Sequence, residues 1–170
     1  MIKIQAITIQ KQAIVQLIQF SALLVFSIFA PLLKMQSLTG PLVNATLFLS
    51  TVLLGVRQGI LIGSVSSSVA LSIGLLPIFL SPMIPFIIIS NMLLVLVFDY
   101  LRRKNYWLGV VSASLSKFLF LFLTSSAVIN FLVKEEMIIK LSSIMGVPQL
   151  FTALTGGVIA FGALKIIKKV

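Results

Sequence analysis

Long apolar runs separated by short polar breaks dominate the chain. Six runs lie near the roughly 20 residues that a transmembrane helix needs. They are Ile14–Leu33, Pro41–Val56, Gln58–Leu76, Met83–Leu101, Tyr106–Val133 and Pro148–Ile167. The pattern predicts an all-α, polytopic membrane protein, a bundle of six transmembrane helices.

The second run is short and is separated from the third only by Arg57, which predicts either two short helices in a tight hairpin or a difference in tilt between them. An alternative has five spans, with these two runs forming one broken hairpin. The fifth run is long and must tilt or protrude. No segment resembles an appended soluble domain, so we expect one six-helix transmembrane domain over residues 1–170.

Composition supports the membrane assignment. Apolar residues make up 59% of the chain and charged residues only 9%, whereas a soluble domain has about 25% charged residues. Such a chain could not cover a water-exposed surface with polar groups.

Lysine and arginine positions predict the orientation. Nine of them fall on one side of the predicted membrane and three on the other. The nine are Lys3, Lys11, Arg57, Arg102, Arg103, Lys104, Lys165, Lys168 and Lys169; the three are Lys34, Lys134 and Lys140. By the positive-inside rule, both termini are cytoplasmic in a cell (plasma) membrane.

The residue inventory excludes most enzyme chemistry. The chain has no His, no Cys and only three acids, Asp99, Glu135 and Glu136. Catalytic triads, cysteine nucleophiles and Cys/His zinc sites are therefore ruled out. We expect no enzyme activity, no metal site and no cofactor. The net charge of +10 does not indicate nucleic acid, because the basic residues lie between apolar runs and form no single patch.

Lys117 is the most informative polar residue. It lies eleven residues after Tyr106, which places it roughly 16 Å deep at 1.5 Å per residue. It has no obvious acidic partner, because Asp99 lies in reach of Arg102 and Arg103 instead. Two explanations stay open: a neutral or snorkelling lysine satisfied by backbone carbonyls, or a cation that awaits an anionic ligand group.

Asn91 in the fourth run lies at a depth that could meet Lys117. It is either a ligand contact or part of an interhelical hydrogen bond. In the sixth run Gln149, Thr152 and Gly156 share one helical face. That face either contacts a ligand or packs against a neighbouring helix.

A stripe of small residues follows one face of the third run. Its members are Gly59, Gly63, Ser67, Ala70 and Gly74, and such spacing favours close helix packing within the chain over a partner surface. Gln12, Gln16 and Gln19 form another stripe on the first run, which faces either a partner protein or the membrane interface.

The chain carries no energy source of its own. It lacks the phosphate-binding motif of an ATPase, and apart from Asp99, near the end of the fourth run, its spans have none of the acidic or His residues of an ion-driven carrier. Uphill transport would therefore need other subunits.

Four stretches resemble the substrate-specific S-components of energy-coupling factor (ECF) transporters. They are residues 36–77, SPMIPFIIISN (81–91), SKFLFLF (116–122) and PQLFTALTGG (148–157). The likeness covers roughly residues 36 to 165 through hydropathy rhythm and Gly, Pro, Asn, Lys and Gln landmarks.

The resemblance implies a vitamin-binding subunit that works with a transmembrane coupling subunit and two cytoplasmic ATPases. It implies an outward-opening pocket built mainly from the fourth, fifth and sixth helices. The loop from Lys34 to Pro41 and the segment from Lys134 to Gly146 would cover it. The family's small residues spaced by four on the first helix are missing, since the residue four positions after Ala22 is Phe26.

We therefore expect a small, vitamin-like, water-soluble substrate, membrane lipid around the helices and no nucleic-acid partner. Lys117 would hold a carboxylate or phosphate of the substrate. Asn91, Gln149 and Thr152 would bind its polar edge, and Phe86, Phe120 and Phe151 would form the walls. Two other functions stay open: a membrane anchor or assembly subunit for a cytoplasmic enzyme complex, and an autonomous facilitator or channel.

Overall fold

The computed structural model describes residues 2–33, 35–73, 78–132 and 145–169, and these residues form six α-helices. The helices are α1 (Ile2–Phe29), α2 (Gln36–Leu53), α3 (Val56–Ser72), α4 (Ile84–Arg102), α5 (Tyr106–Leu132) and α7 (Val147–Ile166). Short 3₁₀ turns, Ala30–Leu33 and Ile78–Met83, follow α1 and precede α4. The all-α prediction is confirmed.

Four segments of the described residues are long and apolar enough to cross a membrane. They are Gln10–Leu33, Ser81–Arg102, Tyr106–Ser126 and Val147–Ile166. The other two predicted spans correspond to shorter helices, α2 with 18 residues and α3 with 17. The chain is thus a multi-pass helical membrane protein with four candidate spans, and spanning by α2 and α3 stays a prediction.

The hairpin between α2 and α3 turns at Leu54 and Gly55, not at Arg57. Gly55 has φ +97° and ψ 175°, a backbone conformation that is essentially restricted to glycine. Arg57 lies in the first turn of α3 instead. The tight hairpin of two short helices is therefore correct, but glycine conformational freedom and not charge places the turn.

The predicted loop from Lys34 to Pro41 is wrong for its described part. The helix α2 begins at Gln36, and Pro41 lies inside it. Pro41 is the sixth residue of α2, beyond the first turn in which proline is tolerated, so α2 lacks the hydrogen bond from this position to the carbonyl of Ser37. The other predicted cover, Lys134–Gly146, lies outside the described residues apart from Met145 and Gly146, and Lys34 also lies outside them.

We expect Gly55→Ala to destabilise the protein by about 1–3 kcal/mol. The nearest heavy atom to an added Cβ is Gln58 Oε1 at 3.8 Å, so the cost is backbone strain and not a clash. Thermal unfolding in detergent would measure it. Gly162→Ala is the control, because nothing lies within 4 Å of its added Cβ; equal midpoints for both variants would contradict the expectation.

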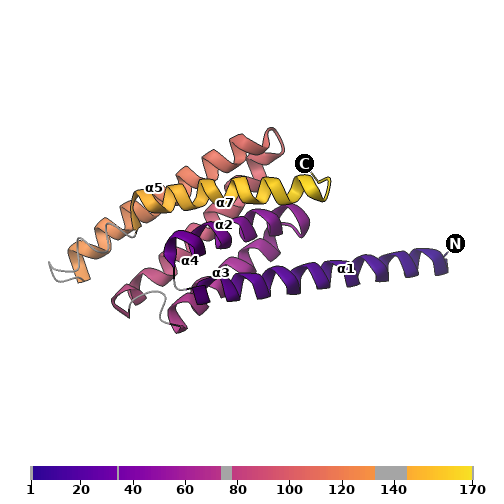
Figure 1. Ribbon diagram of the computed structural model, residues 1–170, viewed down its shortest axis with the longest axis horizontal. Coiled ribbons are helices and arrows are strands. Elements are labelled where there is room, and N and C mark those ends of the chain that lie inside the picture. The colour runs from indigo at the N-terminus through magenta and orange to yellow at the C-terminus, as the bar shows by residue number, and fades with distance from the viewer. Residues whose placement is uncertain (1, 34, 74–77, 133–144, 170) are drawn as a thin grey trace.

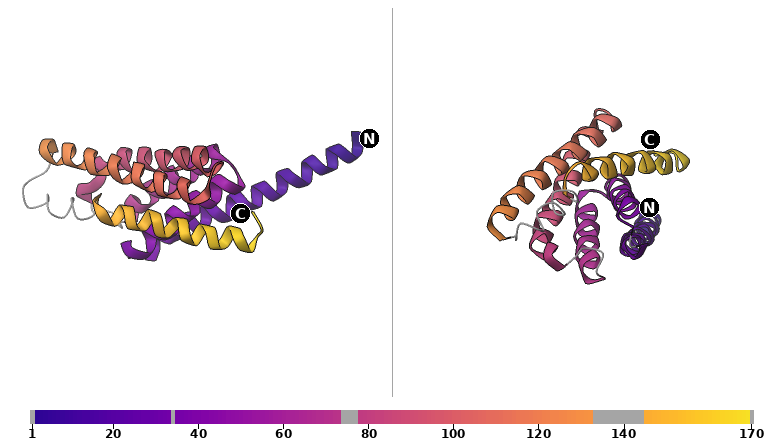
Figure 2. Two further views of the ribbon diagram at one scale, coloured as in Figure 1. Left: turned by 90° about the horizontal axis from the view of Figure 1, so that it is seen from above. Right: turned by 60° about the vertical axis from the view of Figure 1, so that its left-hand side comes forward.

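Figure 1 shows the helices running roughly lengthwise, with both chain termini at the same end. Helix α2 packs against α7 and α3, while α4 packs against α3 and α5. The amino-terminal part of α1 extends beyond the other helices (Figure 2). Both termini therefore lie at the same end of the helices; their place on the cytoplasmic side of a membrane stays a prediction.

The small-residue face of α3 packs within the chain. Gly59 lies against Thr51 of α2 and Val95 of α4, and Gly63 lies against Leu47 and Asn91. The four described members of the stripe are all buried, whereas Gly74 lies outside the described residues. The prediction of packing within the chain is confirmed, and this close approach brings α2 and α4 together over α3.

Helices α2 and α7 also approach at backbone distance. A Cβ added to Gly40 would lie 2.7 Å from Thr152 Cγ2, and one added to Gly156 would lie 2.6 Å from Asn44 Cβ. The face of α7 that carries Thr152 and Gly156 is therefore a helix contact. It holds α2 in a position where Asn44 is buried.

Candidate functional site

A buried polar cluster joins four helices around Lys117. Its Nζ donates to Asn44 Oδ1 of α2 and to Asn91 Oδ1 of α4, each at 2.7 Å. Asn91 Nδ2 in turn donates to Ser67 Oγ of α3 at 2.9 Å. All four side chains are at most 5% exposed. We call Lys117, Asn44, Asn91 and Ser67 the lysine cluster.

The lysine cluster contains no carboxylate. Asp99, the one acid among the described residues, pairs with Arg102 at 2.7 Å and with Arg103 at 3.0 Å, as predicted. Lys117 has no acidic partner among the described residues, as the sequence indicated; two side-chain amides accept from it instead. Backbone carbonyls, the alternative considered above, are not its hydrogen-bond acceptors in the described part of the chain.

The two interpretations of Asn91 are both compatible with its geometry. Its oxygen meets Lys117, and its amide nitrogen makes an interhelical hydrogen bond to α3. One asparagine can do both because its side chain has an acceptor oxygen and a donor nitrogen. Its role as a substrate contact stays a prediction.

The lysine cluster retains unused hydrogen-bonding capacity. A protonated amine has three donors, and Lys117 uses two of them on described residues. Ser114, one turn before Lys117 on α5, is fully buried and its hydroxyl has no hydrogen-bond partner among the described residues. Buried polar atoms without partners are rare in native proteins.

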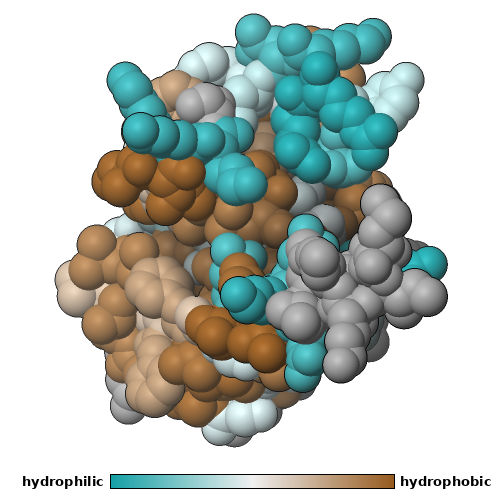
Figure 3. All heavy atoms as spheres, turned by 90° about the vertical axis from the view of Figure 1, so that its right-hand side faces the viewer, coloured by the Kyte–Doolittle hydropathy of each residue, from teal (hydrophilic) through white to brown (hydrophobic). Residues whose placement is uncertain are grey.

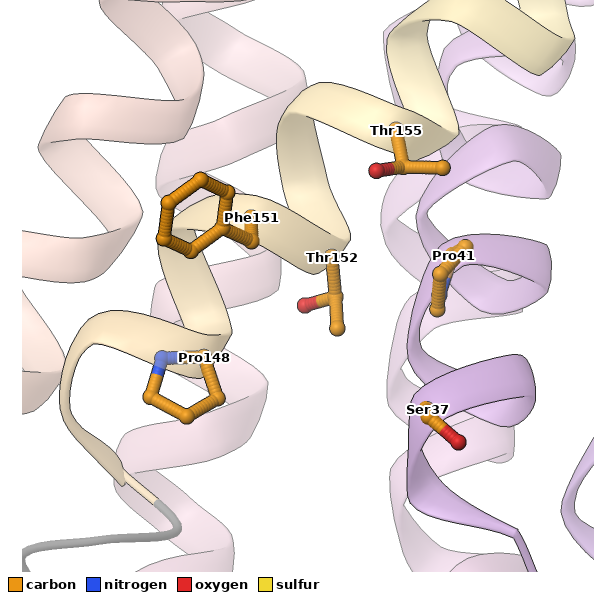
Figure 4. A pocket seen from close by; sticks show the side chains of 6 residues that line it. All are labelled: Ser37, Pro41, Pro148, Phe151, Thr152 and Thr155. Atoms are coloured by element: carbon orange, nitrogen blue, oxygen red, sulfur yellow. The ribbon is translucent and has the colours of Figure 1, made fainter.

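A second feature is an open pocket between the amino-terminal parts of α2 and α7. Its volume is about 370 Å³, and it is lined by Ser37, Pro41, Pro148, Phe151, Thr152 and Thr155. In Figure 4 Thr152 and Thr155 face the helix that carries Ser37 and Pro41. The size falls within the range of small-molecule sites. We call this the α2/α7 pocket.

The α2/α7 pocket is adjacent to the lysine cluster but separate from it. Pro41 lines the pocket, and its carbonyl oxygen would lie 2.9 Å from a Cβ at Gly156. Asn44 lies three residues further along α2, against the same glycine. The contact between Gly156 and α2 therefore forms the boundary between the pocket and the cluster.

The structure divides the predicted site residues into groups. Lys117 and Asn91 meet in the lysine cluster, whereas Phe151 and Thr152 line the α2/α7 pocket. The Thr152 hydroxyl donates to the backbone oxygen of Gln149. Phe86, Phe120 and Gln149 are partly buried and line neither feature.

Sequence reasoning missed Asn44 and the role of Ser67. Asn44 lies inside the second predicted span, so the rule that singled out Asn91, a polar residue within a membrane run, would also have found it. Ser67 was noted only as a member of the small-residue stripe. Its contact with Asn91 depends on how α3 and α4 pack, which the spacing along α3 does not reveal.

A buried lysine beside a small-molecule-sized pocket, in a helical membrane protein, fits a solute-binding subunit. A family model described as ECF transporter, substrate-specific component, matches residues 8–169. The chain belongs to this family. No curated protein and no solved structure matches it.

The assignment confirms the resemblance noted in the sequence. As an S-component the protein is the substrate-binding membrane subunit of a transporter and not an enzyme. Membership in the family implies a substrate and an ECF module as partners.

Proposed function

We propose that this S-component captures a water-soluble vitamin or vitamin-like molecule with an anionic group from outside the cell. A transmembrane coupling subunit and two cytoplasmic ATPases would then drive its import, with both termini of the S-component in the cytoplasm. The observation that carries the proposal is Lys117, buried within the helices and hydrogen-bonded to neutral amides only, among the described residues.

Electrostatics supports an anionic ligand. A buried ammonium is costly unless a counter-charge or strong hydrogen bonds compensate it. Two amide oxygens provide hydrogen bonds but no negative charge. A carboxylate or phosphate on the substrate would supply that charge, and the hydroxyl of Ser114 would supply a further hydrogen bond.

The α2/α7 pocket supports a route to this anchor. It lies at the end of the helices opposite the chain termini, where α2 and α7 begin. In the proposed orientation this is the outer side. Substrate would enter at Phe151 and Thr152 and reach Lys117 when α7 separates from α2 at Gly156.

Native mass spectrometry of the detergent-purified protein tests the proposal. Nanomolar affinity corresponds to about −12 kcal/mol, so a captured substrate should survive purification and appear as an added mass of a small, acidic molecule. Protein that never carries such a mass, from cells grown in rich medium, would contradict substrate capture. A retained molecule without an acidic group would contradict the role of Lys117.

Asn44→Asp offers a sharper test of the charge. The variant keeps an oxygen that accepts from Lys117, and the Asn44 amide nitrogen donates to no described residue. The new carboxylate would place a negative charge next to the Lys117 amine, in the role that we propose for the anionic group of the substrate. We expect folding to be retained and affinity for the anionic substrate to fall by about 10- to 100-fold, equivalent to 1.4–2.8 kcal/mol.

Calorimetric titration of the stripped variant with the identified substrate would measure this loss. Asn105→Asp is the matched control, because it adds the same charge at the exposed turn between α4 and α5. It should bind like the unmodified protein. An equal loss in both variants would contradict a local effect at Lys117.

A further inference from the structure

The end of the protein that carries both termini has two groups of basic side chains. One is at the turn after α4, with Arg102, Arg103 and Lys104; the other is at the end of α7, with Lys165, Lys168 and Lys169. Figure 3 looks at this end and shows hydrophilic residues gathered over its upper part, above a hydrophobic surface.

The charges of these residues are not equally available. Asp99 pairs with both arginines. The four lysines are exposed and form no ion pair with a described residue. One carboxylate offsets only one of the two arginine charges, so the turn keeps a surplus positive charge on its arginines and on Lys104, and the end of α7 adds three lysines.

An aromatic pair lies between the two basic groups. The rings of Trp107 and Phe161 are 4.9 Å apart, and Tyr106 donates to the backbone oxygen of Gly157 at 2.9 Å. These contacts pair α5 and α7 in opposite directions. Lys104 precedes Trp107 by three residues, in the turn before α5, and Lys165 follows Phe161 by four residues on α7, so both lysines lie beyond the same end of the aromatic pair along the chain.

The Trp107 ring is the exposed member of the aromatic pair, whereas Phe161 is partly buried. Trp107 is 43% exposed and lies in the first turn of the apolar segment Tyr106–Ser126. Tryptophan and tyrosine prefer the headgroup level of a bilayer, where one part of the ring is apolar and the other is wet. Lys104 and Lys165 would therefore lie at headgroup level, with the rings of Trp107 and Phe161 on their membrane side.

We propose that this surface binds an anionic phospholipid. The phosphate and headgroup lie between Lys104 and Lys165, and an acyl chain lies along Trp107 and Phe161. Basic residues between membrane helices attract anionic headgroups. Topology alone needs only a surplus of positive residues near the span ends. It does not require cations from two separate segments around an aromatic pair whose Trp107 ring is exposed.

Trp107 is the single tryptophan of the chain, so its fluorescence reports on this site alone. The full-length protein would be reconstituted in bilayers that contain brominated phosphatidylglycerol or brominated phosphatidylcholine with identical chains. We expect phosphatidylglycerol to quench Trp107 with a relative binding constant roughly five- to tenfold higher. Free phosphate cannot produce this signal, because the quencher is on the acyl chain.

The variant Lys104→Gln/Lys165→Gln should reduce this preference to nearly one. The variant Lys11→Gln/Arg57→Gln removes two exposed charges from α1 and α3 and should keep it. Equal quenching by the two lipids in the unmodified protein would overturn the proposal. An equal loss of the preference in Lys11→Gln/Arg57→Gln and in Lys104→Gln/Lys165→Gln would also overturn it, because the effect would then depend on total charge and not on this surface.

Discussion

Replacing Lys117 with methionine is expected to weaken substrate binding by about 10- to 150-fold. A hydrogen bond to a charged group contributes roughly 1.5–3 kcal/mol, and each 1.4 kcal/mol is a factor of about ten in affinity. Methionine is unbranched, apolar and adaptable, so it fills the space of the lysine stem without a charge. Calorimetry with the identified substrate would measure the loss.

The matched control is Lys11→Met, the same substitution at an exposed position of α1, which should leave affinity unchanged. Unchanged affinity in Lys117→Met would mean that the lysine cluster only ties α2, α4 and α5 together. If Lys117→Met fails to fold, Asn44→Asp still distinguishes the two cases, because it keeps the hydrogen bond and changes only the charge.

Gly156→Ala is expected to give the largest loss of stability from a single methyl group. The added Cβ would lie 2.6 Å from Asn44 Cβ, 2.8 Å from Ala45 N and 2.9 Å from Pro41 O. Two of these atoms belong to the backbone of α2, so no side-chain rotation can relieve the contact and α7 must move away. Overpacking of this kind costs about 1–3 kcal/mol or more.

Thermal unfolding in detergent would show this as a midpoint lower by ~4–10 °C, since each kcal/mol shifts the midpoint of a domain of this size by a few degrees. Gly162→Ala lies on the same helix in open space and should be neutral or slightly stabilising, because alanine is the better helix former. A midpoint for Gly156→Ala equal to that of Gly162→Ala would show that α2 and α7 do not pack as described.

The sequence alone determined the class of the protein and its most informative residue. Apolar runs of membrane length dictate helices, because a bilayer leaves backbone polar groups no other partners. The lack of His and Cys excluded most catalysis. A lysine within such a run is energetically costly to bury, so its presence alone indicates a functional role. Helix starts and ends are less well determined: the hydropathy pattern starts the second run at Pro41, whereas α2 begins at Gln36.

Only the tertiary structure decided what surrounds Lys117. Asn44, Asn91 and Ser67 are 73, 26 and 50 positions from it in the sequence, and they meet because glycines on α3 and α7 let the helices approach closely. Hydropathy along one helix does not specify which face meets which neighbour; that choice depends on the fit of side chains between helices. The separation of Phe151 and Thr152 from Lys117 has the same cause, since the Gly156 contact with α2 lies between them.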